Sequence, residues 1–459
     1  MILYFIYLIA VLWLVGRLPF LRNSNIKPNV LRVLFLIKVV FGAISLFIYS
    51  NYYSEETSDM HIYFKAGEVL HSSLKESPSD YFSLLTGIND DQPHLAKYNK
   101  TIPRWKKPYD YDMYNENKTV IRFNGFIRLF SGGNIHTHNL FFNLISFIGL
   151  IAIFRFLSNE LSNKRLTPLF LIIFFMPTIL FWGSAILKES ITIFALGLLL
   201  WSLKLILDNC KNWKAWIVLL ISGYLFAHTK IYVVLSVVPG LLWLILNRFY
   251  SKHRFLTFTA IHVAVALIAF NIHLISPNYN LINVISGKQN DFINMITNMT
   301  DVGSAVDLPR LDGSLSAIFK LMPMGFCNAL FRPHLFECHN IMTFAAALEN
   351  LFIVVFIILG LVFANYSKKY PPHIFFGISF SVILLTIIGI TTPVLGALVR
   401  YKLPALPFIV AIFITTFDTN KYRKIMNSLK LNRIMRFCDS SVEKCKNLIF
   451  TNDIIQKHN

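Results

Sequence analysis

Long apolar runs constrain this chain more than any other feature of its sequence. A helix that crosses a bilayer needs about 20 mainly apolar residues, and eleven runs approach or exceed that length. They lie at residues 2–19, 30–50, 139–157, 167–184, 190–207, 214–227, 231–247, 255–275, 342–364, 373–391 and 403–417. The stretch 214–247 has two interpretations: two short spans that join near His228, or one span with a long flank.

The composition agrees with this pattern. Hydrophobic residues make up 55% of the 459 positions and charged residues only 15%, whereas a soluble protein carries about 25% charged residues. The 42 Phe side chains are too many for the cores of two or three soluble domains. We therefore exclude an ordinary cytosolic enzyme, a disordered chain and a disulfide-stapled secreted scaffold. The predicted fold class is all-α: a polytopic integral membrane helical bundle of about eleven transmembrane helices, with two long extracytoplasmic loops that bear short amphipathic helices.

The net charge of +19 predicts how the bundle lies in the membrane. In a soluble protein this excess would indicate nucleic acid binding, but in a membrane protein Lys and Arg gather in cytoplasmic connections. With the N-terminus outside, the cytoplasmic segments carry 24 Lys or Arg and 6 Asp or Glu, and the opposite side carries 18 of each. Those segments are 17–32, 155–165, 204–214, 248–254, 368–369 and 418–459. Lys38 lies within the second span, and we expect it to snorkel toward the basic side.

Spans and connections divide the chain into six parts. These are two N-terminal transmembrane helices (1–50), a first extracytoplasmic loop (51–138), central transmembrane helices (139–275), a second extracytoplasmic loop (276–341), C-terminal transmembrane helices (342–417) and a basic cytoplasmic tail (418–459). The tail is either an interfacial helix against anionic lipid or a solvated basic segment. The richness in Asn and Lys is typical of a bacterial chain. We therefore expect the inner (plasma) membrane rather than the endoplasmic reticulum.

Motifs of soluble enzymes are missing from the sequence. There is no Gly-x-Gly-x-x-Gly, P-loop, His-Glu-x-x-His or Gly-x-Ser-x-Gly string, so nothing indicates nucleotide hydrolysis, a nicotinamide cofactor or a zinc hydrolase. No cofactor is predicted with certainty, and a divalent cation (Mg or Mn) stays open. Cys327 and Cys338 lie in the second outer loop, where they either form a disulfide or stay as two free thiols.

Ionisable residues at span ends are costly and are therefore candidates for function. Here they gather on the predicted outer side. Glu56 and Asp59 follow the second span, and Tyr63 lies one helical turn beyond Asp59. A carboxylate at the mouth of a span is suited to act as a general base toward a hydroxyl group, or to hold a divalent cation. The alternative is that these acidic residues cap and solvate a helix end.

Two further outer turns carry charged residues. Lys188 and Glu189 lie between the fourth and fifth spans. They form either a local ion pair of little energy or part of a site in which Lys188 binds a lipid-linked phosphate. His228 and Lys230 occupy the next outer turn. Because a lone histidine is more often structural, we assign His228 a supporting role and count Lys230 among the phosphate-binding candidates.

The second loop ends in another polar group. Arg332 and His334 precede the ninth span, and Glu349 lies inside that span about two turns from its outer end. A carboxylate in an apolar helix needs a partner, and we expect Arg332 to pair with it. That pair would either be structural or place an arginine–glutamate cluster at the mouth of a cavity.

Basic residues near the last span lie on the outer side, against the positive-inside tendency. Arg400 and Lys402 flank Tyr401 there. An Arg fork matches phosphate oxygens bidentately and Lys adds a point charge; the alternative is contact with lipid headgroups. Arg122 and Arg128 lie in a stretch with an apolar stripe at helical spacing. This pattern predicts an amphipathic outer helix whose arginines either contact headgroups or line a substrate groove.

Several short strings resemble those of a known class. The acidic motif "SDMHIY" after an early span, the amphipathic outer loop, "FWGSAILKES" and "RYKLPALPF" resemble the GT-C class of polytopic glycosyltransferases. The string "LFRPHLFE" followed by "ALEN" is similar to membrane proteins of bacterial surface-polysaccharide clusters, and O-antigen and capsule polymerases are similar in span number and outer loops. Two features depart from the GT-C pattern. The acidic motif follows the second span rather than the first, and the string at 55–59 holds no Asp-x-Asp or Glu-x-Asp, which leaves metal dependence open.

The resemblance implies a polyprenyl-phosphate or polyprenyl-diphosphate sugar as donor, handled on the outer face. It also implies Asp59 as catalytic base and Arg400 as the foremost ligand of the lipid phosphate. We therefore expect an integral membrane glycosyltransferase of cell-surface polysaccharide biosynthesis, in which Lys402, with Lys188 or Arg332, helps Arg400 to stabilise the leaving phosphate. Its partners would be membrane lipid, the lipid-linked donor and a glycan or lipid-linked acceptor, and no nucleic acid.

Two alternatives stay open. A repeat-unit polymerase for O-antigen or capsule uses the same donor chemistry, so the sequence hardly separates it from a single-sugar transferase. A flippase or exporter of lipid-linked glycan would catalyse no reaction. It would need charged residues along a path through the bilayer, whereas the middles of the predicted spans are nearly free of charge.

Overall fold

The computed structural model describes residues 1–52, 54–106, 114–159, 161–277, 279–297, 304–365, 370–428 and 432–451. These residues form helices and three isolated β-bridges, and no β-strand occurs among them. Eight helical segments are long and apolar enough to cross a membrane. They are α3 (Pro28–Tyr52), α8 (Ile135–Ser158), α11 (Lys188–Asp208), α13 (Ile231–Phe249), α14 (Arg254–Asn271) with η2 (Ile272–Leu274), α17 (Ile341–Val362), α18 (Pro372–Thr391), and α19 (Leu395–Tyr401) with η4 (Leu403–Ala405) and α20 (Leu406–Thr416). The predicted all-α polytopic bundle is confirmed.

Shorter apolar helices complete the bundle. They are α1 (Ile2–Arg17), α9 (Asn163–Phe175), α12 (Trp213–Ala227) and α16 (Leu315–Phe331). The predicted run 167–184 is broken, because α9 ends before Met176 and α10 (Pro177–Trp182) begins after it. Pro177 lacks a backbone N–H and disfavours a helical conformation in the residue before it. Met176 is accordingly extended, with φ −61° and ψ 125°.

α16 lies in the second long connection, where the sequence predicts short surface helices. It packs closely against the span α18 instead. A Cβ atom added to Gly389 would lie only 1.8 Å from the carbonyl oxygen of Gly325, so the two backbones touch at this point. Small residues at such crossings are typical of helix pairs in membranes. We conclude that α16 extends the bundle rather than resting beside it.

The first long connection folds into a compact unit, the cap, which comprises residues 54–106 and 114–134. Its helices are α4 (Asp59–Glu76), α5 (Pro78–Thr86), η1 (Pro93–Leu95), α6 (Ala96–Thr101) and α7 (Asn117–Ser131). Ser77 starts α5 by accepting a hydrogen bond from the N–H of Asp80, and Gly87 ends it in a left-handed conformation with φ +83°. The apolar faces of α4 and α7 pack on each other around Tyr63, Leu70 and Ile121. The same apolar cluster includes Phe142 of α8 and Ile191 of α11, so the core of the cap continues into the bundle.

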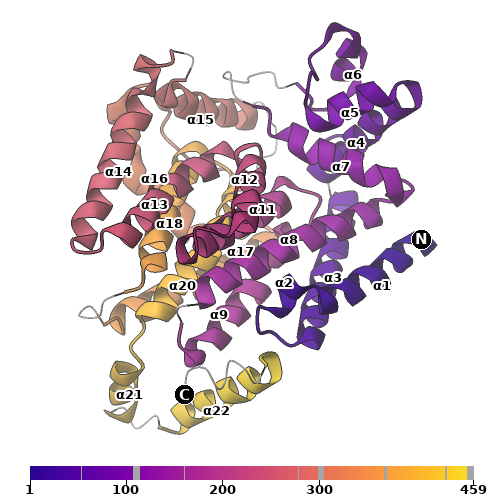
Figure 1. The fold of residues 1–459 in the computed structure, drawn as a ribbon. Coiled ribbons are helices and arrows are strands. Elements are labelled where there is room, and N and C mark those ends of the chain that lie inside the picture. Colours follow the sequence, from indigo (N-terminus) through magenta and orange to yellow (C-terminus); the bar gives the residue numbers. More distant parts are fainter. Residues whose placement is uncertain are drawn as a thin grey trace.

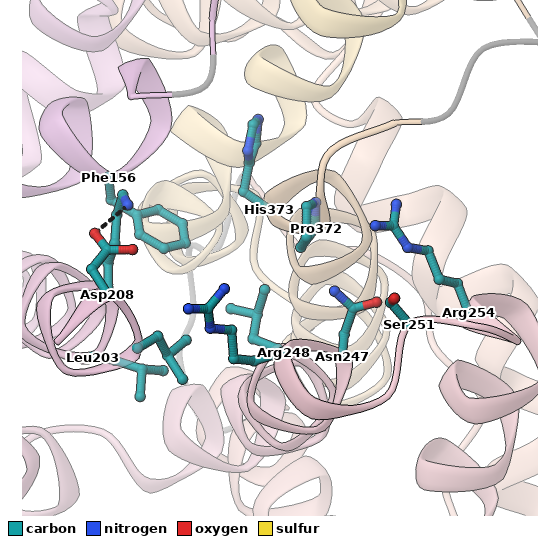
Figure 2. A pocket seen from close by; sticks show the side chains of 12 residues that line it. Phe156, Leu203, Asp208, Asn247, Arg248, Ser251, Arg254, Pro372 and His373 are labelled. Atoms are coloured by element: carbon teal, nitrogen blue, oxygen red, sulfur yellow. Dashed lines mark hydrogen bonds and ion pairs between the residues drawn. The ribbon is translucent and has the colours of Figure 1, made fainter. Parts of the chain in front are cut away.

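The bundle has two chemically different ends. Figure 1 shows the cap and α15 (Leu281–Thr297) at one end, and α21 (Thr419–Ser428) and α22 (Asn432–Ile449) at the other. We call them the cap end and the basic end. At the basic end Lys27 bonds to the Asn447 carbonyl, and Arg165 donates to the Phe417 carbonyl at 2.9 Å. The ends of α11, α13 and α18 surround a pocket there (Figure 2). This grouping matches the predicted charge partition, and the direction of insertion stays a prediction.

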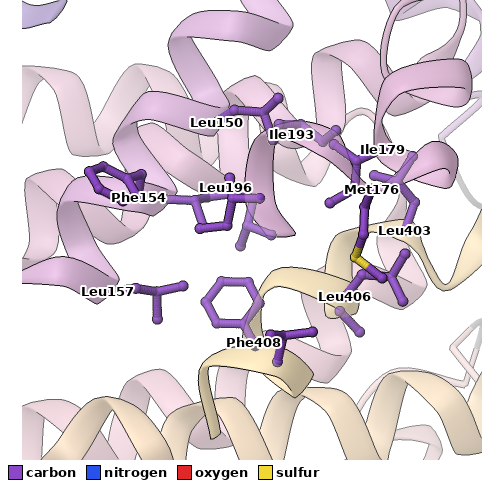
Figure 3. Packing of buried hydrophobic residues seen from close by; sticks show 14 of the residues in the cluster. Leu150, Phe154, Leu157, Met176, Ile179, Ile193, Leu196, Leu403, Leu406 and Phe408 are labelled. Atoms are coloured by element: carbon purple, nitrogen blue, oxygen red, sulfur yellow. The ribbon is translucent and has the colours of Figure 1, made fainter. Parts of the chain in front are cut away.

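Apolar packing between the two ends positions the spans. In Figure 3, Leu150 of α8 and Leu196 of α11 face Leu406 and Phe408 of the last span across one core. α8 and α11 approach so closely that a Cβ atom on Gly197 would lie 2.2 Å from the Gly149 carbonyl oxygen. This contact holds the first turn of α11, and hence Glu189, in a set position at the cap end.

Candidate functional site

A buried carboxylate forms the centre of the candidate site. Glu189 lies in the first turn of α11, and its side chain has no solvent exposure. Arg400, in α19, donates from Nε to Oε1 of Glu189 at 2.7 Å and from Nη2 to Oε2 at 3.0 Å. Lys230, which precedes α13, donates from Nζ to Oε1 at 2.6 Å. Paired charges are the form in which ionisable groups tolerate burial in a membrane protein.

The same arginine links this centre to the cap. Nη1 of Arg400 donates to Oδ2 of Asp59 at 2.7 Å, although the two residues are 341 positions apart. Asp59 is the first residue of α4 and also accepts a hydrogen bond from Arg104. The exposed fraction of the side chains rises from 0% at Glu189 through 24% at Asp59 to 37% at Arg104. The charge network (Asp59, Arg104, Glu189, Lys230 and Arg400) thus runs from a dry interior to the surface.

The network holds three cations and two carboxylates, so its formal charge is +1. Burial alone would raise the pKa of Asp59, but the charges of Arg400 and Arg104 outweigh it and hold that pKa well below its usual range. Burial also lowers the pKa of Lys230 to about 8, although Glu189 favours its charged form. Asp59 is therefore ionised at neutral pH, and the cationic excess is suited to attract an anion.

Aromatic rings surround the cations of the network. The guanidinium carbon of Arg400 lies 5.6 Å from the centre of the Trp182 ring, and Nζ of Lys230 lies 4.6 Å from that of Tyr401. Tyr63 donates from its hydroxyl to Oδ1 of Asn117 at 2.8 Å, so it ties α4 to α7 beside the network. Such rings contribute about 0.5–2 kcal/mol per cation–π contact and exclude water.

Lys188 and Glu189 point to different partners. Nζ of Lys188 lies 3.3 Å from Oε1 of Glu116 in the cap, while Glu189 faces Arg400 and Lys230. Successive helical residues point about 100° apart, so neighbours at the start of α11 contact different elements. The interpretation of Lys188 and Glu189 as a local ion pair is therefore wrong.

Lys38 supports the turn before α11. Its buried Nζ donates to the Gly183 carbonyl and lies 3.0 Å from Oγ of Ser184. Asn143 donates to the Ser184 carbonyl at 3.0 Å. The prediction that Lys38 snorkels to the basic side is wrong, because the break between α10 and α11 offers acceptors within the bundle. Together these contacts hold the segment that carries Glu189.

A second polar cluster lies near the charge network. Lys402 donates from Nζ to Oδ1 of Asn350 and, at 3.2 Å, to the Arg332 carbonyl. Oε2 of Glu349 accepts from the N–H of Thr178 at 2.6 Å. That N–H lies in the first turn of α10, where backbone donors have no partner within the helix.

The prediction that Arg332 pairs with Glu349 is wrong. Nε of Arg332 donates to Oε1 of Glu337 at 2.6 Å instead. Glu337 ends the short helix η3 (Leu335–Glu337), and its other oxygen accepts from the N–H of His334 at 3.1 Å. Glu337, only five positions from Arg332, satisfies the arginine locally, while Glu349 is already bound to α10.

Other predicted residues lie outside the charge network. Arg122 donates to the Leu84 carbonyl at 2.9 Å and to Oδ2 of Asp90 at 2.7 Å, so it holds the cap together. The Thr119 hydroxyl donates a hydrogen bond to the backbone carbonyl of His228 at 2.6 Å, and this contact joins the cap to the bundle. Glu56 is exposed in the turn before α4.

Sequence reasoning missed Arg104 and Tyr232. Arg104 lies in a cap loop with a left-handed backbone (φ +57°), and no motif marks it. The hydroxyl of Tyr232 is buried and has no hydrogen-bond partner among the described residues. Its ring lies 5.9 Å from the ring of Tyr401. An aromatic residue two positions after Lys230 was the only signal in the sequence for Tyr232.

The donor set of the network does not suit a divalent cation. Within the described ranges, no group of three or more His, Cys, Asp and Glu side chains comes together. The two carboxylates already accept from Arg400, and a metal ion would meet three neighbouring cations. Cys327 and Cys338 are free thiols, so of the two alternatives the structure favours the unpaired one.

Comparisons with protein-family models, with curated proteins and with solved structures find no match for this chain. The fold by itself defines a multi-pass helical membrane protein with a charge network buried at one end of the bundle.

Proposed function

We propose that this protein is an integral membrane glycosyltransferase that uses a polyprenyl-phosphate- or polyprenyl-diphosphate-linked sugar as donor on the outer membrane face. The observation that carries the proposal is the contact between Asp59 and Arg400 at the cap end. It puts a partly exposed, ionised carboxylate beside cations that come from distant segments. Acid–base chemistry and anion stabilisation require this combination in one place.

The reaction would proceed by displacement at the anomeric carbon of the donor sugar. An acceptor hydroxyl attacks that carbon, the bond from the carbon to the phosphate oxygen breaks, and the lipid phosphate leaves with the electron pair. Asp59 accepts the proton of the hydroxyl. Its lowered pKa makes it a weak base, which suffices when the proton moves late, after most of the carbon–oxygen bond has broken.

Arg400 and Arg104 would stabilise the charge that grows on the leaving phosphate. Both already contact Asp59, and the network has a formal charge of +1 without a ligand. Lys402 is engaged with Asn350 and the Arg332 carbonyl. We therefore propose Arg104, rather than Lys402, as the second phosphate ligand. No step in this scheme uses a metal ion.

The transporter alternative is less favoured by the position of the charges. A flippase would need polar groups along the length of the bundle, whereas the charge network lies at the cap end and the core beneath it is apolar. A polymerase would use the same donor chemistry and differs only in its acceptor. Measuring whether product length grows by single sugars or by repeat units would separate these two enzymes.

The test uses Asp59→Asn and Arg400→Ala in membranes supplied with lipid-linked sugar. We expect transfer to fall by roughly 10²–10³-fold in each variant, as when a group that stabilises transition-state charge is removed. Glu68→Gln is the matched control, because it removes an exposed carboxylate of the same helix whose ion-pair partner among the described residues is Arg128. Full retained transfer in both site variants would contradict the proposal, and glycan flux without a new glycosidic bond would favour the transporter.

A further inference from the structure

A pocket at the basic end is separate from the charge network. It has a volume of about 350 Å³ and lies where five helices end or begin. α8, α11 and α13 contribute residues near their C-terminal ends, and α14 and α18 contribute their first residues. Its apolar wall includes Phe156, Leu203 and Leu244, and polar side chains border the rest. Pockets of this kind between helix ends are places where ligands bind.

Cations dominate the polar part of the pocket. Lys204, Arg248 and Arg254 line it together with one acidic residue, Asp208, which gives a formal charge of +2. Lys204 and Asp208 form an ion pair at 2.8 Å. Arg254 donates to the Tyr370 carbonyl at 3.2 Å. No side-chain hydrogen bond or ion pair joins Arg248 to another residue in the described part of the chain, and Figure 2 shows its guanidinium extending between the helices.

A buried amide adds an unmet hydrogen-bonding group. Asn247 is only 6% exposed and lines the pocket, and within the described ranges its Oδ1 atom has no hydrogen-bond partner. A buried polar atom without a partner destabilises the fold unless a ligand or water satisfies it. A ligand that carries a hydroxyl group near an anionic group would satisfy both this acceptor and the neighbouring arginines.

Exposed apolar side chains adjoin the cationic rim. Phe249 and Phe255 flank the stretch between α13 and α14 and are 80% and 76% exposed. Leu256 and Tyr250 are exposed beside them. In a helix bundle that crosses a membrane, such side chains face acyl chains, and this arrangement distinguishes a lipid from a soluble phosphate compound. Basic pockets between helix ends are known to bind anionic headgroups.

We propose that this pocket binds the phosphate headgroup of an anionic phospholipid, with Arg248 and Arg254 as the phosphate ligands. Asn247 accepts from a headgroup hydroxyl, and the acyl chains lie along the exposed apolar side chains at the start of α14. The site is independent of the proposed glycosyl transfer, because it lies at the opposite end of the bundle and shares no residue with the charge network.

The experiment measures lipid binding to the full-length purified protein in nanodiscs. The discs contain phosphatidylcholine with or without 20% phosphatidylglycerol, and bound lipid is counted by native mass spectrometry after gentle release. The site variant is Arg248→Gln with Arg254→Gln, which keeps side-chain length. The matched control is Lys211→Gln with Lys214→Gln, which removes two exposed charges from the same end that do not line the pocket.

We expect the wild-type protein to retain phosphatidylglycerol in preference to phosphatidylcholine. Two charges, each contributing about 1 kcal/mol near the surface, correspond to a loss of roughly thirtyfold in affinity for the site variant. The control should stay within about twofold of the wild type. Asn247→Leu, which changes no charge, should lower retention severalfold and serves as a second variant if the arginine variant does not fold.

Two results would overturn the proposal. One is equal retention of phosphatidylglycerol by the wild-type protein and both site variants, since the lipid would then be bound only non-specifically around the bundle. The other comes from a thermal-unfolding arm in detergent. If glycerol 3-phosphate alone raised the unfolding temperature as much as phosphatidylglycerol does, the pocket would be a site for a soluble phosphate and not for a lipid.

Discussion

The two ends of the bundle handle their positive charges in different ways. At the cap end, Arg400 contacts the carboxylates of both Asp59 and Glu189, and Lys230 shares Glu189 with it. At the basic end, Arg248 and Arg254 border a pocket whose lining includes one carboxylate, and that carboxylate pairs with Lys204. One end thus contains a network in which each cation has a carboxylate partner and which reaches the surface at Arg104. The other end presents cations that line an open pocket.

This difference follows from burial. An isolated charge in an apolar interior is very costly, so the cap end can place Arg400 there only together with its carboxylates. The side chain of Asp208, by contrast, is 61% exposed, and water screens the charges around it. Breaking an ion pair should therefore have large effects at the cap end and small effects at the basic end. The four predictions below test that contrast, from the largest expected effect to the smallest.

Glu189→Gln should have the largest effect on stability. It leaves Arg400 and Lys230 buried without their shared carboxylate, and loss of one partner of a buried pair costs about 3–5 kcal/mol. Thermal unfolding of the purified protein in detergent measures this loss. Asp208→Asn at the basic end is the comparison variant, with an expected loss below about 1 kcal/mol. Equal losses in the two variants would show that burial does not distinguish the two ends.

Arg400→Lys should weaken the proposed transfer while keeping the charge. A lysine is a point charge and cannot contact Asp59 and both oxygens of Glu189 together. Hydrogen bonds to charged groups contribute about 1.5–3 kcal/mol, which corresponds to roughly a 10–100-fold loss of rate. Arg128→Lys alters a single ion pair of the cap and is the control. Unchanged transfer in Arg400→Lys would show that a positive charge is sufficient at this position.

The contribution of Asp59 to the stability of the fold should change with pH only in the acidic range. Its pKa is lower in the folded protein than in the unfolded chain, so its ion pairs stabilise the fold above pH 4 and this contribution is lost as the pH falls through the folded-state pKa. The difference in unfolding free energy between the wild type and Asp59→Asn should accordingly stay constant from pH 5 to 8 and shrink below about pH 4. A difference that already declines between pH 7 and 5 would mean that the arginines do not hold Asp59 ionised.

Asp208→Asn should strengthen binding of anionic lipid at the basic end. It removes the acidic residue of the pocket lining and raises the formal charge from +2 to +3. One charge near the membrane surface contributes about 1 kcal/mol, or roughly fivefold in affinity. The nanodisc experiment with phosphatidylglycerol measures the change, and phosphatidylcholine is the control lipid. Weaker binding in this variant would contradict the electrostatic account of the pocket.

The fold was largely predictable because apolar runs report directly on helices in a bilayer. Each of the eleven predicted runs contains helix. The described residues of the predicted basic-side segments lie together at one end, and the predicted segment 368–369 lies outside the described residues. The helix α16 and the packed cap were less predictable. α16 is apolar but shorter than a span, and the helices of the cap mix polar and apolar residues. Only contacts with α18, or between α4 and α7, decide where they lie.

The candidate site was predictable in residue type but not in pairing. Asp59, Glu189, Lys230 and Arg400 all follow from charge at the ends of spans, and the structure joins them in one network. The partner of Arg332 and the direction in which Lys38 extends were predicted wrongly. Each side chain is bound by a neighbour that tertiary packing provides. The role of Arg104 could not be predicted, because nothing distinguishes an arginine in a loop until its position beside Asp59 is known.

The sequence by itself determined that this chain is a multi-pass helical membrane protein and which of its charges lie at span ends, because the hydrophobic effect acts on local composition. The tertiary structure alone decided which carboxylate neutralises which cation. Attraction between charges depends on the distance in space, and the contact between Asp59 and Arg400 spans 341 positions of the chain. The same dependence leaves Arg248 beside an open pocket and encloses Arg400 between two carboxylates.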